Sequence, residues 1–129
     1  MTQIQNSKTY DLEERTWEFA KRVRAFLKVL PKSMANLEDG KQLLRSSGSV
    51  GANYIEANES LSKKDLIMRI KICRKEAKES RYWLNLIDTL GDQDHEDTRL
   101  SLAQEATELT NIFGSILRKM ERDYGNLSI

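Results

Sequence analysis

The stretch from Gly40 to Ile87 constrains the fold of this 129-residue chain most strongly, because it reads as two long helices folded back on one another. Between residues 62 and 87, apolar and small side chains recur at alternating steps of four and three, which places them on one face of a helix. These positions are Leu66, Ile70, Cys73, Ala77, Ser80, Leu84 and Ile87. A heptad pattern of this length is typical of a long bundle helix, so we expect a helix from the Ser62 N-cap to Gly91.

The preceding segment, from the Ser33 N-cap to about Ser60, predicts a partner helix with an unusually small face. We expect its core side to comprise Met34, Leu37, Gly40, Leu44, Ser47, Gly51, Tyr54, Ile55 and Asn58. Each glycine costs a helix about 1 kcal/mol relative to alanine, and close approach of a neighbouring helix offsets that cost. The alternative is a phosphate-binding loop, which is disfavoured because Gly48-Ser-Val-Gly51 has no preceding strand and no Gly-Lys-Ser/Thr ending. A GxxG loop of the KH type would also carry basic residues where Ser49 and Val50 stand.

The flanking segments predict two further helices, over residues 11–30 and 94–125. The first repeats apolar residues at Phe19, Val23 and Phe26 and is stopped by Pro31. The second begins at an Asp94 cap, ends at Gly125 and carries the stripe Leu102, Ala106, Leu109, Phe113, Ile116, Leu117 and Met120. Four helices with short connections predict an all-α, antiparallel up-down four-helix bundle over residues 10–124. Residues 1–9 are expected to be a flexible lead-in and residues 125–129 a loose tail.

Composition excludes several classes of protein. The chain has 21 Lys and Arg against 20 Asp and Glu, so its formal net charge of +1 gives no global attraction to nucleic acid or membrane. Charges interrupt every apolar run, so no transmembrane helix is expected. A single cysteine and the absence of a signal peptide favour the cytoplasm. Because Cys73 lies on the heptad stripe, we expect a buried, inert thiol.

No catalytic site is evident. Bundles that bind two irons use inward Glu residues with Glu-x-x-His motifs, none of which occurs here, and the sole histidine, His95, lies in the connection before the last helix. A hydrolase is disfavoured because there is no Gly-x-Ser-x-Gly elbow. We therefore predict no catalytic residue, no metal ligand, no cofactor and no small-molecule substrate.

Polar residues on the two central helices predict a network between them. Antiparallel pairing about a turn near Leu61 brings together residues whose numbers sum to about 124, which places Arg45 near Glu79 and Glu56 near Arg69. We expect buried or interfacial ion pairs here, because charges that leave solvent need partners. The full set is Arg45, Asn53, Glu56, Arg69, Glu76 and Glu79.

Charge is concentrated on the third predicted helix. Residues 63–88 hold eight cationic and four acidic side chains, net +4, whereas residues 94–123 hold four cationic and seven acidic ones, net −3. The row opposite the heptad stripe comprises Lys64, Lys71, Arg74, Lys75, Lys78 and Arg81, with Tyr82 as a candidate stacking ring. This row predicts nucleic-acid phosphate contacts, and the alternative is a solvated charged face without a partner.

Several apolar residues fall outside the core stripes and predict self-association, because a lone bundle cannot bury every such face. The predicted oligomer interface comprises Trp17, Leu43, Val50 and Trp83. Leu43 and Val50 belong, with Ala57, to a second apolar row on the helix over residues 33–60. For Trp17, the alternative is a residue that simply flanks the core.

Six short motifs together resemble a known family: Gln42-Leu-Leu-Arg45, Ser49-Val-Gly-Ala-Asn53, Ile55-Glu-Ala57, Ser62-Lys-Lys-Asp65, Arg74-Lys-Glu-Ala77 and Glu79-Ser-Arg-Tyr-Trp-Leu84. They resemble the bacterial four-helix-bundle proteins encoded in 23S rRNA intervening sequences, and the likeness extends from about Arg15 through the last helix. More distantly, the chain is similar to the accessory proteins of diversity-generating retroelements. One departure is Leu66, where the family is expected to carry Phe. The resemblance implies a cytoplasmic homo-oligomer, a pentamer, with an RNA-related role.

The function predicted from these features is non-enzymatic. We expect an oligomeric bundle that binds RNA or a nucleoprotein partner through the basic row. The alternative is a protein-only scaffold or adaptor without nucleic-acid binding, and a metalloenzyme ranks third.

Overall fold

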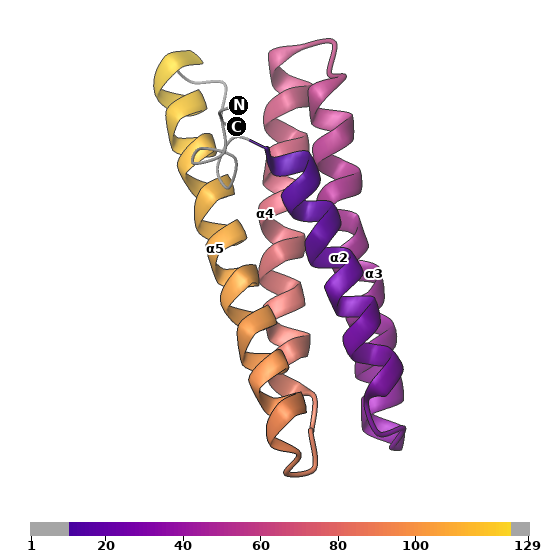
Figure 1. The fold of residues 1–129 in the computed structure, drawn as a ribbon. Coiled ribbons are helices and arrows are strands. Elements are labelled where there is room, and N and C mark those ends of the chain that lie inside the picture. The colour runs from indigo at the N-terminus through magenta and orange to yellow at the C-terminus, as the bar shows by residue number, and fades with distance from the viewer. Residues whose placement is uncertain (1–10, 125–129) are drawn as a thin grey trace.

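A computed structural model describes residues 11–124, which form four helices: α2 (Leu12–Val29), α3 (Met34–Asn58), α4 (Lys63–Leu86) and α5 (Gln93–Tyr124). The helices run alternately down and up (Figure 1), with α3 packed on both α2 and α4, and α4 packed on α5. The predicted all-α, antiparallel up-down bundle is confirmed. The predicted lead-in (1–9), tail (125–129) and helix end at Gly125 lie outside the described residues.

The helix starts depend on side-chain caps. The hydroxyls of Ser33 and Ser62 each accept a hydrogen bond of 3.1 Å from the backbone N–H three residues later, as predicted. The start of α5 differs from the prediction. There the Asp92 carboxylate accepts from the backbone N–H of His95 at 3.0 Å, so Asp92 rather than Asp94 is the cap.

The α4 helix ends at Leu86, before the predicted end at Gly91. Just beyond that point, the buried side chain of Asn36 in α3 forms two hydrogen bonds with the backbone of Asp88. Asn36 Nδ2 donates to Asp88 O at 2.8 Å, and Asp88 N donates to Asn36 Oδ1 at 3.0 Å. The backbone of Asp88 is therefore used by α3 instead of by a continuing helix. Gly91, with φ of 83°, belongs to the turn that follows.

The core confirms the heptad stripe of α4 from Ile70 to Ile87, whereas at its start Leu66 is only partly buried and Ile67 is fully buried. The face of α3 differs from the prediction. Leu43 and Val50, predicted as interface residues, are fully buried in the bundle core, so their assignment to an oligomer interface was wrong. Five residues predicted to be core are instead exposed: Met34, Leu37, Leu44, Ile55 and Asn58. At 100° per residue the real face is rotated by roughly a quarter turn from the predicted one. Small buried hydroxyls permit this rotation, because Ser46 Oγ and Ser80 Oγ share a hydrogen bond of 2.8 Å across α3 and α4.

The glycines of α3 mark close contact with α2, as predicted. A Cβ on Gly51 would lie 2.9 Å from Thr16 Oγ1, and one on Gly40 would lie 3.3 Å from Leu27 Cδ2. A side chain at Gly51 would therefore push the two helices apart.

Candidate nucleic-acid interface and polar network

The outward face of α4 carries four lysines of the predicted row. Lys64, Lys75 and Lys78 are exposed and Lys71 is half-buried. We call Lys64, Lys71, Lys75 and Lys78 the α4 lysine face. It extends over roughly 21 Å, given a rise of 1.5 Å per residue. The exposed side chains of Met68, Tyr82 and Leu86 lie among or beyond these lysines on the same helix.

The two arginines of the predicted row lie toward α5 instead. Arg81 is half-buried and its Nη1 donates to Thr107 Oγ1 at 3.3 Å. Arg74 is exposed, but its guanidinium lies against Gly114 of α5: a Cβ added to that glycine would lie 3.3 Å from Arg74 Nε. The predicted row of six is therefore divided, and only the four lysines share one outward surface.

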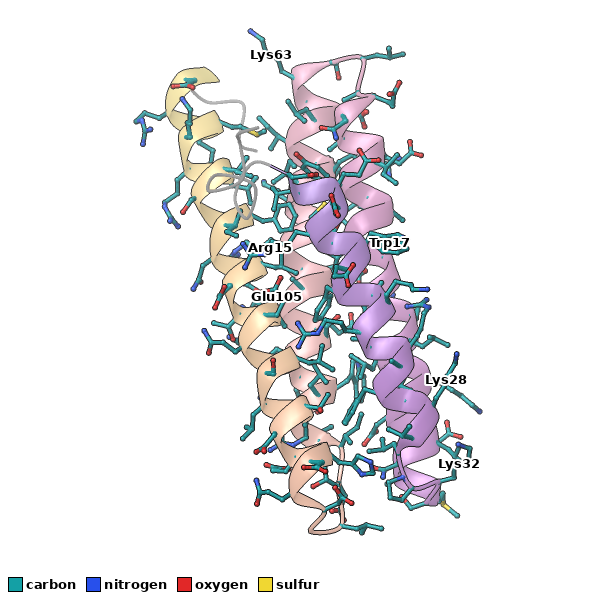
Figure 2. All side chains as sticks on the ribbon, viewed as in Figure 1. Arg15, Trp17, Lys28, Lys32, Lys63 and Glu105 are labelled. Atoms are coloured by element: carbon teal, nitrogen blue, oxygen red, sulfur yellow. The ribbon has the colours of Figure 1, made fainter. Side chains whose placement is uncertain are left out.

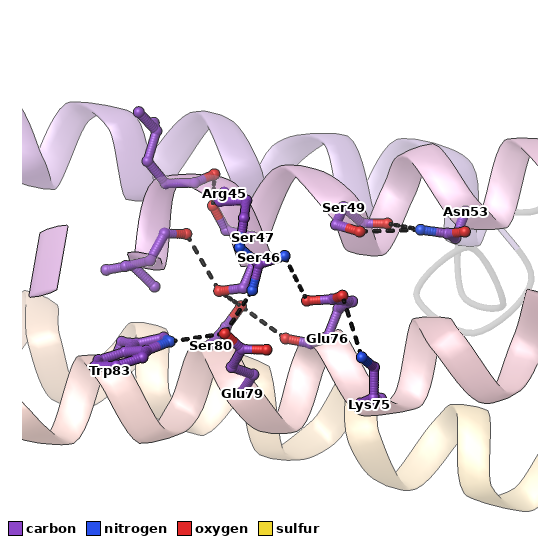
Figure 3. Close-up of polar contacts among 12 residues, drawn as sticks. Arg45, Ser46, Ser47, Ser49, Asn53, Lys75, Glu76, Glu79, Ser80 and Trp83 are labelled. Carbon is purple, nitrogen blue, oxygen red and sulfur yellow. Dashed lines mark hydrogen bonds and ion pairs between the residues drawn. The ribbon is translucent and has the colours of Figure 1, made fainter. Parts of the chain in front are cut away.

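The polar network lies on the α3–α4 seam (Figure 3). Arg45 Nη2 donates to Glu79 Oε2 at 2.5 Å, and its Nη1 donates to Glu76 Oε1 at 3.4 Å. Trp83 Nε1 donates to the same Glu79 oxygen at 3.0 Å. The predicted pairing of Arg45 with Glu79 is confirmed. The Arg45 side chain is 51% exposed, whereas that of Glu76 is only 7% exposed, so the network is at the edge of the bundle.

The hydrogen bonds of the network shift its ionisation. Burial by itself would raise the pKa of Glu79, but the hydrogen bonds from Trp83 and Arg45 bring that pKa below its ordinary value. The hydrogen bond to Glu79 in turn raises the pKa of Arg45. Both groups are therefore charged at neutral pH.

The predicted pairing of Glu56 with Arg69 was wrong. Arg69 Nη1 donates to Asn53 Oδ1 at 3.0 Å, and Asn53 Nδ2 donates to Ser49 O at 2.9 Å. Glu56 is exposed. The reason is helical geometry. Three residues turn a helix by about 300°, so the Glu56 side chain points about 60° away from that of Asn53, which faces α4.

The sequence reasoning missed a cluster of ion pairs that Arg15 forms between α2 and α5. Arg15 Nε donates to Glu105 Oε2 at 2.7 Å, and Arg15 Nη2 donates to Glu108 Oε1 at 2.7 Å. Figure 2 shows Arg15 and Glu105 meeting between α2 and α5. The Arg15 side chain is 12% exposed, and its pKa is raised chiefly by the Glu105 hydrogen bond. The steps of three and four that join Leu12, Arg15 and Phe19 were the available signal.

A second surface lies where α2 meets α3, on the side away from α5. There Trp17 is 56% exposed, and the small residues Ala20, Gly48 and Ala52 form an open groove with it and with Ile55. The groove has a volume of about 600 Å³. We call it the α2/α3 groove. The fourth predicted interface residue, Trp83, is instead half-buried against the core.

The thiol and the metal-ligating residue types form no site in the described region. Cys73 is fully buried and donates to Val50 O at 3.4 Å, and burial raises the pKa of its thiol to about 12, which confirms the expected buried thiol. Within residues 11–124, no three His, Cys, Asp or Glu side chains are grouped to hold a metal ion. Over the same residues, no helix combines the length and apolar character needed to cross a membrane.

The half-exposed position of Arg45 gives a first testable result. Arg45→Ala is expected to lower the free energy of unfolding by about 1–2 kcal/mol, less than a fully buried pair would cost, because among residues 11–124 it leaves the Glu76 carboxylate paired only with the Lys75 ammonium at 3.9 Å. The pKa of Glu79 is depressed on folding, so this stabilisation is present above the ordinary glutamate pKa and disappears as pH falls through the lowered value. Urea melts of parent and variant at pH 7 and below pH 3 measure both effects. A pH-independent difference would show that the Arg45 charge is not involved.

Comparison with known proteins gives the family. A family model described as 23S rRNA-intervening sequence protein matches residues 8–115. The fold is similar to a crystal structure of a protein of unknown function from the S23 ribosomal protein family of Bacteroides thetaiotaomicron, with a TM-score of 0.72 and 32% identity over 86% of this chain and 98% of that chain. No curated protein matches the sequence. The resemblance seen in the motifs is thereby confirmed, and this chain belongs to the 23S rRNA-intervening sequence protein family.

Proposed function

We propose that this protein is a non-enzymatic, cytoplasmic homo-oligomer that binds RNA, alone or within a nucleoprotein, through the α4 lysine face. The observation that carries the proposal is the exposure of three lysines with a half-buried fourth on one surface of α4. The acidic contact of Lys75 is weak, since its Nζ lies 3.9 Å from Glu76 Oε2. The family description, which refers to 23S rRNA, supports RNA as the class of nucleic acid.

A chain with a net charge near zero can bind phosphates when its positive charges are gathered on one surface. The acidic side chains of α5 offset the cations of α4 in the total of +1, but the two sets lie on different helices. Local positive charge, rather than net charge, determines whether phosphates are attracted within a Debye length of about 8 Å at physiological salt. An oligomer would present several such faces together and multiply their affinity.

The test is the salt dependence of binding to a single-stranded RNA, measured by fluorescence anisotropy. Each neutralised phosphate should contribute about −0.7 to the slope of log affinity against log salt. A protein that binds no RNA at low salt contradicts this function and favours the alternative, a protein-only scaffold.

The α2/α3 groove supports the oligomeric part of the proposal, with a second copy of this chain as its occupant. Its acidic end carries exposed Asp11, Glu13 and Glu14, and exposed Lys28 and Lys32 lie toward the other end of α2. The acidic end of this surface in one copy is complementary in charge to the basic end of the same surface in another copy. The exposed apolar residues between those ends would then leave water.

Self-association is expected to be lost in Ile55→Asp, because a carboxylate in the groove would have to be desolvated without a partner. Light scattering at micromolar concentration measures the mass. The parent should exceed the monomer mass of 14.9 kDa, and the resemblance implies a pentamer. Leu61→Asp is the matched control, because Leu61 is fully exposed at the α3–α4 turn, away from the groove. A parent mass near 15 kDa would contradict the proposal.

A further inference from the structure

We infer that Tyr82 is a stacking platform for an RNA base, so that the α4 lysine face takes single-stranded rather than duplex RNA. The inference rests on the proposed function and specifies its ligand. It depends on the position of an exposed ring beyond the lysines and on the contacts that hold that ring in place.

The Tyr82 ring is accessible and fixed at the same time. Its side chain is 58% exposed, although tyrosine usually buries most of its ring. Its ring packs edge-on against Trp83, with centroids 5.0 Å apart and planes at 75°. Trp83 is in turn held by its hydrogen bond to Glu79, which is bonded to Arg45. The polar network of the α3–α4 seam therefore holds Trp83 in place, and Trp83 in turn restrains the Tyr82 ring that packs against it.

The lysines lie at distances suited to a single strand. Lys78 and Lys75 precede Tyr82 by four and seven residues, so the three side chains project from the same side of α4. At 1.5 Å per residue, Tyr82 lies roughly 6 Å from Lys78 along the helix axis, which is close to the spacing of one nucleotide and its phosphate. A base that stacks on the ring thus brings neighbouring phosphates to the lysines.

A duplex cannot use this platform. Its bases are paired and stacked within the helix, so a protein contacts mainly phosphates and 2′-hydroxyls. The faces of unpaired bases are accessible, and stacking on an aromatic ring is tolerant of sequence. The same four lysines should therefore bind a single strand more tightly than a duplex with as many phosphates.

The experiment compares Tyr82→Ala, Tyr82→Phe and the control Leu86→Ala, which shortens an exposed apolar neighbour on the same helix face. The probe is a fluorescent 12-nucleotide oligoadenylate, with a 12-phosphate RNA duplex alongside. Tyr82→Ala should weaken binding to the single strand about tenfold or more. Tyr82→Phe and Leu86→Ala should bind within about twofold of the parent, because both retain the ring. Circular dichroism verifies that all three variants are folded.

The salt slope distinguishes stacking from charge. Tyr82→Ala should leave the slope unchanged, since it removes no phosphate contact, and it should leave duplex binding unchanged. If the parent binds RNA and Tyr82→Ala binds oligoadenylate equally well, the stacking platform is excluded while the proposed function stands. If the parent binds neither RNA, the proposed function fails and this inference fails with it.

Discussion

Reversal of Lys71, Lys75 and Lys78 to glutamate is expected to weaken RNA binding on the order of a hundredfold at low salt, with the oligomer left intact. The three substitutions replace cations by anions on one surface of α4. They should also flatten the slope of log affinity against log salt by about 2, because three phosphate contacts of about 0.7 each are lost. None of the three residues lies in the α2/α3 groove, so the mass measured by light scattering should not change.

The matched control reverses three exposed cations that lie outside both the α4 lysine face and the α2/α3 groove: Lys41, Lys119 and Arg122. Its net charge changes by the same amount as in the first variant. If binding depends on the α4 lysine face, the control should lose much less affinity than the first variant. Equal losses would show that RNA senses only overall charge, and unchanged binding in the first variant would make α4 a solvated face.

Asn36→Leu is expected to destabilise the bundle by about 2–4 kcal/mol, among the larger effects of a single substitution in this protein. Asn36 is 4% exposed, and its side chain joins the two connections at one end of the bundle. It donates to Pro31 O at 3.1 Å and to Asp88 O at 2.8 Å, and it accepts from Asp88 N. Leucine matches the volume but leaves these backbone groups without partners, at a cost of about 1–3 kcal/mol for each group that water cannot reach.

Urea denaturation of the parent and the variant measures this loss. Asn85→Ala is the control, because Asn85 is exposed on α4 and its replacement should change stability by less than about 0.5 kcal/mol. Asn36→Asp supplies a second comparison, since it keeps the acceptor but loses the Nδ2 donor. A loss below about 1 kcal/mol in Asn36→Leu would show that water replaces the missing partners at this end.

The α4 lysine face could be predicted in part from the sequence, whereas the hydrogen bonds of Asn36 could not. The lysines of α4 were visible as a row, because a helix of known phase fixes which side chains point away from its core stripe. Two members of the predicted row, Arg74 and Arg81, belong to the α5 boundary instead. Their long side chains reach the neighbouring helix, and a periodicity argument does not include that reach.

The sequence by itself determined the number, order and approximate bounds of the helices, because caps, proline and heptad spacing act within a few residues. It also determined the pairing of Arg45 with Glu79, since a short turn at Leu61 fixes the register of α3 against α4. It also determined the burial of Cys73, because the heptad spacing of α4 identifies the face of the helix that turns toward the core.

Only the tertiary structure decided the rotation of α3 and the contacts between distant segments. The α3 helix packs on two neighbours at once, so its buried side is set by both, and a small residue such as Ser46 fills it where a hydrophobic pattern favoured Leu44 and Ile55. The Arg15–Glu105 pair joins residues 90 positions apart, and Asn36 bonds a loop 52 positions away. Local periodicity carries no information about such pairs, because they form only when separate helices meet in space.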